Sequence, residues 1–204
     1  MLHDKELTIG DYWRSIILRG RNVASYKFAL AKTLLDLQPQ GGELIRLDEL
    51  ALPFAKHIAS HLQHTDKQTT SSTSKFLDIC RSYNINEINE NELQDQTVKL
   101  GFNNVIDAFH VVGNQEIETP FYTDLRKTDK GILITDEFSK LQEAIDPADL
   151  SNETEARWRL VETSWSLGIN RGLLGISPDE TGENLEGITN THKRISVTSS
   201  RDAL

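Results

Sequence analysis

Cysteine is almost absent from this sequence: Cys80 is the only one among 204 residues. A lone cysteine excludes an internal disulfide framework and a cysteine-based zinc site within the chain. No apolar run approaches the roughly 20 residues that span a bilayer. The first residues, Met1 to Glu6, are charged and lack the apolar segment of a signal peptide. These absences predict a cytoplasmic protein with no membrane partner.

Sequence motifs for a complete catalytic centre are also lacking. Gly41 and Gly42 are not followed by the Lys-Ser/Thr pair of a phosphate-binding loop. Carboxylates such as Glu87, Glu90 and Asp95 form a stretch typical of a solvated surface, without the spacing of a nuclease core. The net charge of −9 argues against a protein that coats nucleic acid by bulk electrostatics. We therefore predict no catalytic residue and no metal ligand in this chain.

One segment departs from this acidic balance. Between Tyr12 and Leu35 there is no acidic residue, while five basic residues occur: Arg14, Arg19, Arg21, Lys27 and Lys32. Such a segment can contact the phosphates of a duplex. It can equally be a solvated helical face that balances acidic neighbours. The sequence leaves both interpretations open.

The hydrophobic pattern predicts a mainly α fold with one small β-hairpin. We expect residues 1–174 to form a helical domain and residues 175–204 to begin with a polar linker. The clearest expected helices span Asn22–Leu37, Lys75–Tyr83 and the segment that opens at Ser151 or Asn152. Asn152 and Glu155 have the spacing of a capping box. Three other segments are expected to be non-helical: a flexible loop at 64–74, a polar linker at 175–193 and a strand at 194–198.

A change to alternating apolar residues at 121–134 predicts the hairpin. Helices followed by a hairpin form a winged-helix-like element, in which the hairpin tip touches the nucleic-acid backbone. The tip carries Arg126, Lys127 and Lys130, although Asp124 and Asp129 weaken its positive charge. The alternative is a hairpin that only covers a helical core.

Two other candidates for chemistry are weaker. His57, His61 and His64 lie on roughly one face of an expected helix, as metal ligands do. No carboxylate or cysteine completes that set nearby in the sequence, and histidines also suit a helix C-terminus without metal. Cys80 lies on an amphipathic helix, where a small buried side chain is expected rather than a nucleophile.

Three segments resemble a family of bacterial HNH endonucleases. They are DYWRSIIL at 11–18 with GRNVASYKFALAK at 20–32, KLGFNNVIDAFH at 99–110, and EARWRLVET at 155–163. In that family an HNH nuclease with a cysteine-bound structural zinc follows the segment that matches 198–204. The resemblance therefore implies that residues 175–204 are a linker and the start of the missing nuclease domain. The resemblance implies that the divalent metal, the zinc and the catalytic residues belong to that missing nuclease domain, so this chain needs no cofactor of its own.

These observations predict a non-catalytic DNA-recognition or positioning module of an HNH endonuclease that acts in restriction or phage defence. The expected partner is double-stranded DNA, and a homodimer stays open. Changing Arg19, Arg21 and Lys27 together to Glu is then expected to abolish duplex binding and to leave folding intact. The alternatives are a protein–protein interaction or dimerisation module that regulates the nuclease, and an enzyme built on the histidine helix.

Overall fold

The computed structural model describes residues 7–20, 24–168, 175–178, 185–188 and 195–196. Helices dominate this part of the chain, which confirms the predicted mainly α class with a small hairpin. The helices are α1 (Ile9–Arg19), α2 (Tyr26–Leu37), α3 (Leu47–Leu62), α4 (Lys75–Asn84), α5 (Glu90–Leu100), α6 (Val105–Ala108), α7 (Asp136–Ala144) and α8 (Pro147–Ser166). Among these described helices, none has the length and apolar character that crossing a membrane requires.

The strands form three small antiparallel sheets. The largest has the order β1-β5-β4, with β1 (Leu44–Arg46), β4 (Tyr122–Leu125) and β5 (Gly131–Ile134). The second pairs β2 (Val111–Val112) with β3 (Gln115–Glu116), and the third has the order β6-β7-β8, with β6 (Gly175–Pro178), β7 (Leu185–Ile188) and β8 (Ile195–Ser196).

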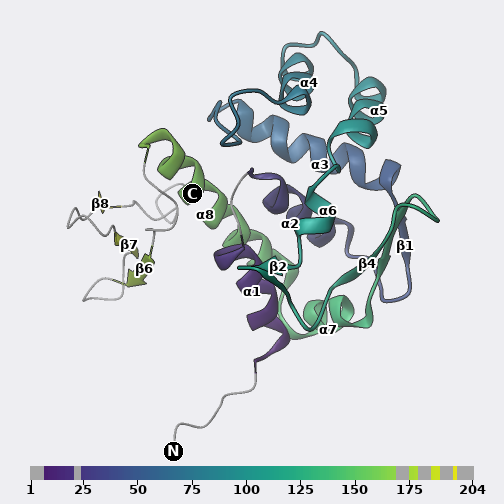
Figure 1. The fold of residues 1–204 in the computed structure, drawn as a ribbon, viewed down its shortest axis with the longest axis vertical. Helices are drawn as coiled ribbons and strands as arrows, with labels where there is room; N and C mark the ends of the chain where they lie inside the picture. The colour runs from purple at the N-terminus through teal and green to yellow at the C-terminus, as the bar shows by residue number, and fades with distance from the viewer. Residues whose placement is uncertain (1–6, 21–23, 169–174, 179–184, 189–194, 197–204) are drawn as a thin grey trace, which may run out of the picture.

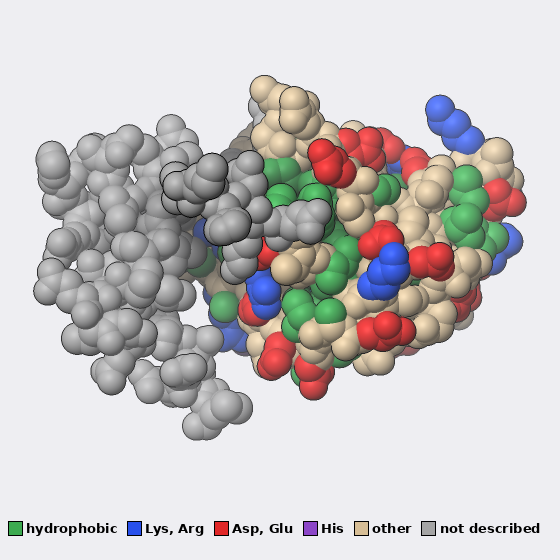
Figure 2. Space-filling model, turned by 90° about the horizontal axis from the view of Figure 1, so that it is seen from below, with side chains coloured by type: hydrophobic (Ala, Val, Ile, Leu, Met, Phe, Trp, Pro, Cys, Tyr) green, Lys and Arg blue, Asp and Glu red, His purple; other side chains and the backbone are tan. Residues whose placement is uncertain are grey.

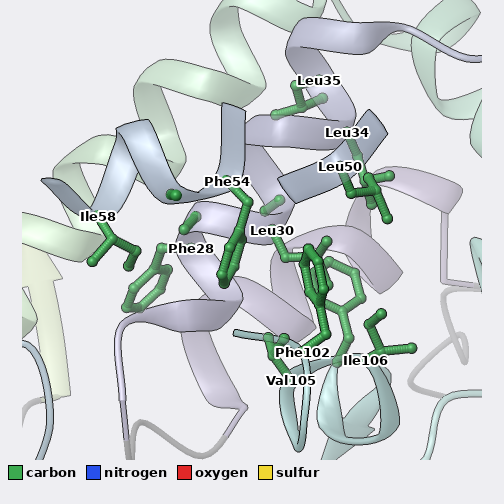
Figure 3. Packing of buried hydrophobic residues seen from close by; sticks show 14 of the residues in the cluster. Phe28, Leu30, Leu34, Leu35, Leu50, Phe54, Ile58, Phe102, Val105 and Ile106 are labelled. Atoms are coloured by element: carbon green, nitrogen blue, oxygen red, sulfur yellow. The ribbon is translucent and has the colours of Figure 1, made fainter. Parts of the chain in front are cut away.

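Helix α2 runs through the centre of the molecule because it is apolar on nearly every side. In Figure 1, α3, α4 and α5 gather at one end and α1 and α7 at the other, with α2 and α6 between them. Figure 3 shows side chains of α2 meeting those of α3 and of the segment around α6. The residues labelled there, from Phe28 on α2 to Phe54 on α3 and Ile106 on α6, are at most 6% exposed. Burial of this kind supplies most of the favourable free energy of folding.

A second group of buried aromatic rings joins α1 to the hairpin and α7. Trp13 of α1 is 1% exposed, and its ring centroid lies 5.9 Å from Phe109, 5.3 Å from Phe121 and 5.9 Å from Phe138. The Trp13–Phe121 pair is edge-to-face, the arrangement that aromatic quadrupoles favour. These four rings bring the N-terminal helix against residues more than 90 positions later.

The predicted hairpin at 121–134 is confirmed as β4 and β5, and β1 adds a third strand to it. Ile45 pairs with Ile132, and Asp124 pairs with Ile132 from the other side. At Gly131 a Cβ atom would come within 2.3 Å of the carbonyl oxygen of Ile45. Glycine is therefore required where β5 passes β1.

The starts of α2 and α8 differ from the sequence-based expectation, and α2 begins at Tyr26 rather than at Asn22. Helix α8 begins at Pro147 rather than near Ser151, because the Asp146 side chain accepts a hydrogen bond from the backbone of Ala148 and proline suits the first helical turn. Asn152 and Glu155 consequently lie inside the helix and form no capping box. Helix α1 begins at Ile9, because Thr8 and Asp11 form a capping box in front of it.

Two segments predicted to be irregular contain described features that the sequence did not indicate. Gln68, in the segment expected to be a flexible loop, is fully buried. Strands β6 and β7 occupy part of 175–193, the range predicted as a linker, and β8 falls within the strand predicted at 194–198. Strand β7 pairs antiparallel with both β6 and β8.

His110 gives the fold a dependence on pH. The side chain is 4% exposed, and its Nε2 accepts a hydrogen bond from the backbone N–H of Phe121 at 3.0 Å. This contact requires an unprotonated Nε2, and burial lowers the pKa of His110 from 6.5 to about 4.

We expect the free energy of unfolding to fall as the pH drops from 6.5 to 4, because His110 binds a proton over this range in the unfolded chain but not in the folded chain. At about 1.4 kcal/mol per pH unit, the loss from His110 approaches roughly 3 kcal/mol. Urea unfolding at several pH values measures it. The variant His110→Gln keeps an acceptor for Phe121 but does not titrate, so its free energy of unfolding should depend less steeply on pH over this interval. An equal pH dependence in both proteins would contradict the assignment to His110.

Candidate functional site

Lys27, one of the basic residues expected to contact DNA, points into the protein. Its Nζ donates hydrogen bonds to the carbonyl oxygens of Ile16 at 2.9 Å and Gly20 at 2.8 Å, and the residue is 7% exposed. Burial, and then the positive charge of Arg157, lowers the pKa of Lys27 to about 7. Lys27 therefore satisfies the last carbonyls of α1, where a cation is favoured by the helix dipole.

Arg157 of α8 has the same role. Its Nη2 donates to the carbonyl oxygen of Leu18 at 2.9 Å, and the residue is 8% exposed. Two buried cations from α2 and α8 thus hold the C-terminal end of α1. The interpretation of Lys27 as an exposed phosphate contact is not supported, because its side chain is enclosed by the protein.

Three further basic residues of the predicted DNA-binding set are ion-paired. Arg14 donates two hydrogen bonds of 2.8 Å to Glu153 of α8. Lys32 lies 3.1 Å from Glu155 of the same helix. Arg126 contacts Asp124 and Asp107 and donates to the carbonyl oxygen of Phe102, so it folds back from the hairpin tip onto the body of the protein.

The other members of the set lie at separate elements. Arg19 is exposed in the last turn of α1, and Lys127 and Lys130 are exposed between β4 and β5. Arg21 lies outside the described residues. On the face shown in Figure 2, Lys and Arg side chains are dispersed among Asp and Glu, with no continuous basic patch on the coloured part of that face.

A cluster centred on His61 of α3 is the most organised polar site in the described part of the chain. Its Nδ1 lies 2.7 Å from Oε1 of Glu162, and its Nε2 lies 3.2 Å from Oε2 of Glu155. The ring is stacked on the indole of Trp158, with centroids 3.5 Å apart and planes within 2°. Glu155, Trp158 and Glu162 share one face of α8 and together enclose the imidazole.

The charges of this cluster follow from its geometry. A carboxylate only accepts hydrogen bonds, so two carboxylates facing both ring nitrogens favour the doubly protonated imidazolium. Burial would lower the pKa of His61, but hydrogen bonds and charge from Glu155 and Glu162 outweigh it and raise that pKa. Burial would raise the pKa of Glu155, yet His61, Arg159 and Lys32 hold it well below its ordinary value.

Gln68 ties the segment after α3 to the same cluster. Its side-chain amide donates to Glu162, and its Oε1 accepts from Nε1 of Trp158 at 3.0 Å. Its backbone oxygen accepts from the N–H of Ser25 at 3.0 Å, just before α2. This is why Gln68 is buried and why the segment is not a free loop.

The arrangement does not favour a metal at the three histidines. His57 faces Asp36 at 2.7 Å, whereas both nitrogens of His61 face glutamates. Among the described residues, no group of three or more His, Cys, Asp or Glu side chains is placed to hold an ion. The Cys80 thiol is buried, and burial raises its pKa to about 12, which suits packing rather than nucleophilic attack.

A hollow of about 590 Å³ lies beside the cluster, between the C-terminal parts of α3 and α8. Its lining includes Ser60, His64, Arg159 and Thr163. Because Glu155 and Glu162 at its edge are already bonded to His61, the hollow lacks a free acid–base pair. Within the described chain we find no arrangement of nucleophile, base and orienting group.

Sequence reasoning found the histidines but missed their partners. Glu155 and Glu162 follow His61 by 94 and 101 residues, so only the tertiary structure brings them together. A signal existed in α8, where Glu155, Trp158 and Glu162 lie on the face that also carries the apolar positions. Carboxylates on a buried helix face require partners.

Comparisons with protein-family models, with curated proteins and with solved structures returned no match to this chain.

Lys27 and Arg19 provide a matched pair for testing the inward orientation of Lys27. We expect Lys27→Glu to lower the free energy of unfolding by roughly 3 kcal/mol or more, because a carboxylate would face two carbonyl oxygens in a buried site. Arg19 is exposed, so Arg19→Glu should lower it by no more than about 1 kcal/mol, the size of a helix-dipole contribution at the end of α1. Urea unfolding followed by circular dichroism compares them. Equal, small effects would mean that Lys27 is accessible after all.

Proposed function

We propose that this chain is a non-catalytic positioning module that acts through protein contacts and regulates an attached or associated nuclease of the HNH type. The identity of the nuclease rests on the resemblance of three segments to HNH endonucleases. The positioning role rests on the structure of α8. Regulation through protein contact was the alternative prediction from sequence, and the orientation of the basic side chains favours it over DNA recognition.

The observation that carries this proposal is the fixation of α8 along its length. In the first half of α8 Glu153 is bonded to Arg14 of α1, and two residues later Glu155 meets Lys32 of α2. Farther along, Arg157 holds the end of α1 and Glu162 holds His61 of α3. Four contacts to three helices hold α8 in place, so that it can position a domain attached after it. It is also the last helix before β6, β7 and β8 in the described chain.

DNA contact is the second candidate, and one observation favours it. Arg19, Lys127 and Lys130 remain exposed, and no ion pair of theirs occurs among the described residues. The hairpin that carries the two lysines is the wing of the predicted winged-helix-like element. Three dispersed cations on a chain of net charge −9 offer few phosphate contacts, so this candidate predicts weak and strongly salt-dependent binding.

Light scattering and a gel-shift assay separate the two candidates. At about 50 mM salt we expect the chain to leave a 30-base-pair duplex unshifted at micromolar protein, because phosphate contacts dominate such binding. A separately expressed nuclease domain of the resembled HNH family should instead co-elute with it. Light scattering of the protein alone reports whether it is a monomer or a dimer.

The matched variant for this assay is the triple change Arg19→Glu, Lys127→Glu and Lys130→Glu, which avoids every buried cation. A duplex shift that this variant abolishes would establish DNA recognition and displace the protein-contact proposal. A duplex shift that survives in the variant would assign binding to other residues.

A further inference from the structure

We propose that the His61 imidazolium is a proton-dependent latch: it fastens the C-terminal half of α8 to α3 and to the segment around Gln68, and loss of one proton opens it. This inference concerns control of α8 and stands whether the module contacts protein or DNA. Its basis is the placement of two carboxylates against both nitrogens of one ring. A neutral imidazole has one donor, so it can satisfy one glutamate but not both.

The charged groups around His61 balance only when the ring is protonated. Helix α2 contributes Lys32 and Asp36, and α3 contributes His57, whose pKa burial lowers despite its contact with Asp36. Helix α8 contributes Glu155, Arg159 and Glu162. With His57 neutral, the carboxylates of Asp36, Glu155 and Glu162 match the cations Lys32, Arg159 and His61. His64 lies at the adjacent hollow.

Loss of the proton leaves Glu162 without a cationic partner among the described residues. Its side chain is 7% exposed, and apart from His61 its described partner is the neutral amide of Gln68. Glu155, by contrast, keeps Lys32 and Arg159. A buried carboxylate that loses its cation is costly, so the structure relieves it by moving Glu162 toward water. That movement takes the C-terminal half of α8 away from α3.

Gln68 spreads the effect beyond the helix pair. The same side chain bonds Glu162 and the indole of Trp158, while its backbone bonds Ser25. Thr69 also forms an isolated bridge with Ala24. Opening at Glu162 therefore loosens the attachment between the segment after α3 and the start of α2. The protonation state of His61 therefore affects the contacts of α8, of α3 with the segment after it, and of the start of α2.

The sign of the pH dependence follows from the raised pKa of His61. The contribution of the latch to the free energy of unfolding is complete below pH 6.5, the ordinary value for histidine. It is lost as the pH rises through the raised pKa. The opening is thus favoured on the alkaline side, opposite to the acid-induced loss expected at His110.

Hydrogen exchange of the 204-residue chain between pH 6 and 9, corrected for the intrinsic pH dependence of exchange, tests the latch. We expect protection of the amides in 155–166 and 65–69 to fall at least tenfold across this range, while α4 and α5 stay constant. Histidine proton resonances should show His61 titrating above 6.5 together with this change. Uniform protection across the range, or a titration of His61 at or below 6.5, would overturn the proposal.

Two variants assign the change to His61. Glu162→Gln removes the second carboxylate, so a neutral ring can donate to Glu155 and accept from the new amide. The pH-dependent fall in amide protection should then occur at least one pH unit lower or disappear. His57→Gln, at the neighbouring hydrogen bond to Asp36, should keep the wild-type transition. If Glu162→Gln retains the wild-type transition unchanged, or if His57→Gln removes it, the proton does not reside on His61 and the latch is refuted.

Discussion

The stacking of the His61 ring on Trp158, with a glutamate at each ring nitrogen, is the interaction that ties α8, which packs mainly on α2, to α3. Hydrophobic contact alone would allow α8 to slide or rotate against α2 and α3, because apolar packing has little directionality. The paired hydrogen bonds fix both the rotation and the register of the helix. Gln68 extends that constraint to the segment after α3.

Other basic side chains of this acidic chain also bind groups within the protein. Lys27 and Arg157 are enclosed, and both hold carbonyl oxygens at the end of α1. Arg14 and Lys32 bind glutamates of α8. Positive charge that seemed available for a partner is used to assemble helices that are far apart in the sequence. This internal use of cations favours a role in positioning over a role in coating a polyanion.

Much of the architecture follows from short-range patterns. The apolar positions of α2 and the alternating residues of β4 and β5 predict their elements, because periodicity reports which face of a segment is buried. The predictions failed where a neighbour in space decided the outcome. Gln68 lies in a polar, low-complexity segment, yet contacts from Ser25, Trp158 and Glu162 bury it.

By itself, the sequence determined the helical class, the hairpin and the residue types able to carry charge, since these depend on composition and on spacing over a few positions. Only the tertiary structure decided which cations face water and which partners His61 receives. A segment of sequence contains no information on the direction of a lysine or on a glutamate 101 residues away. That decision comes from the packing of α1, α2, α3 and α8, which sets both burial and distance.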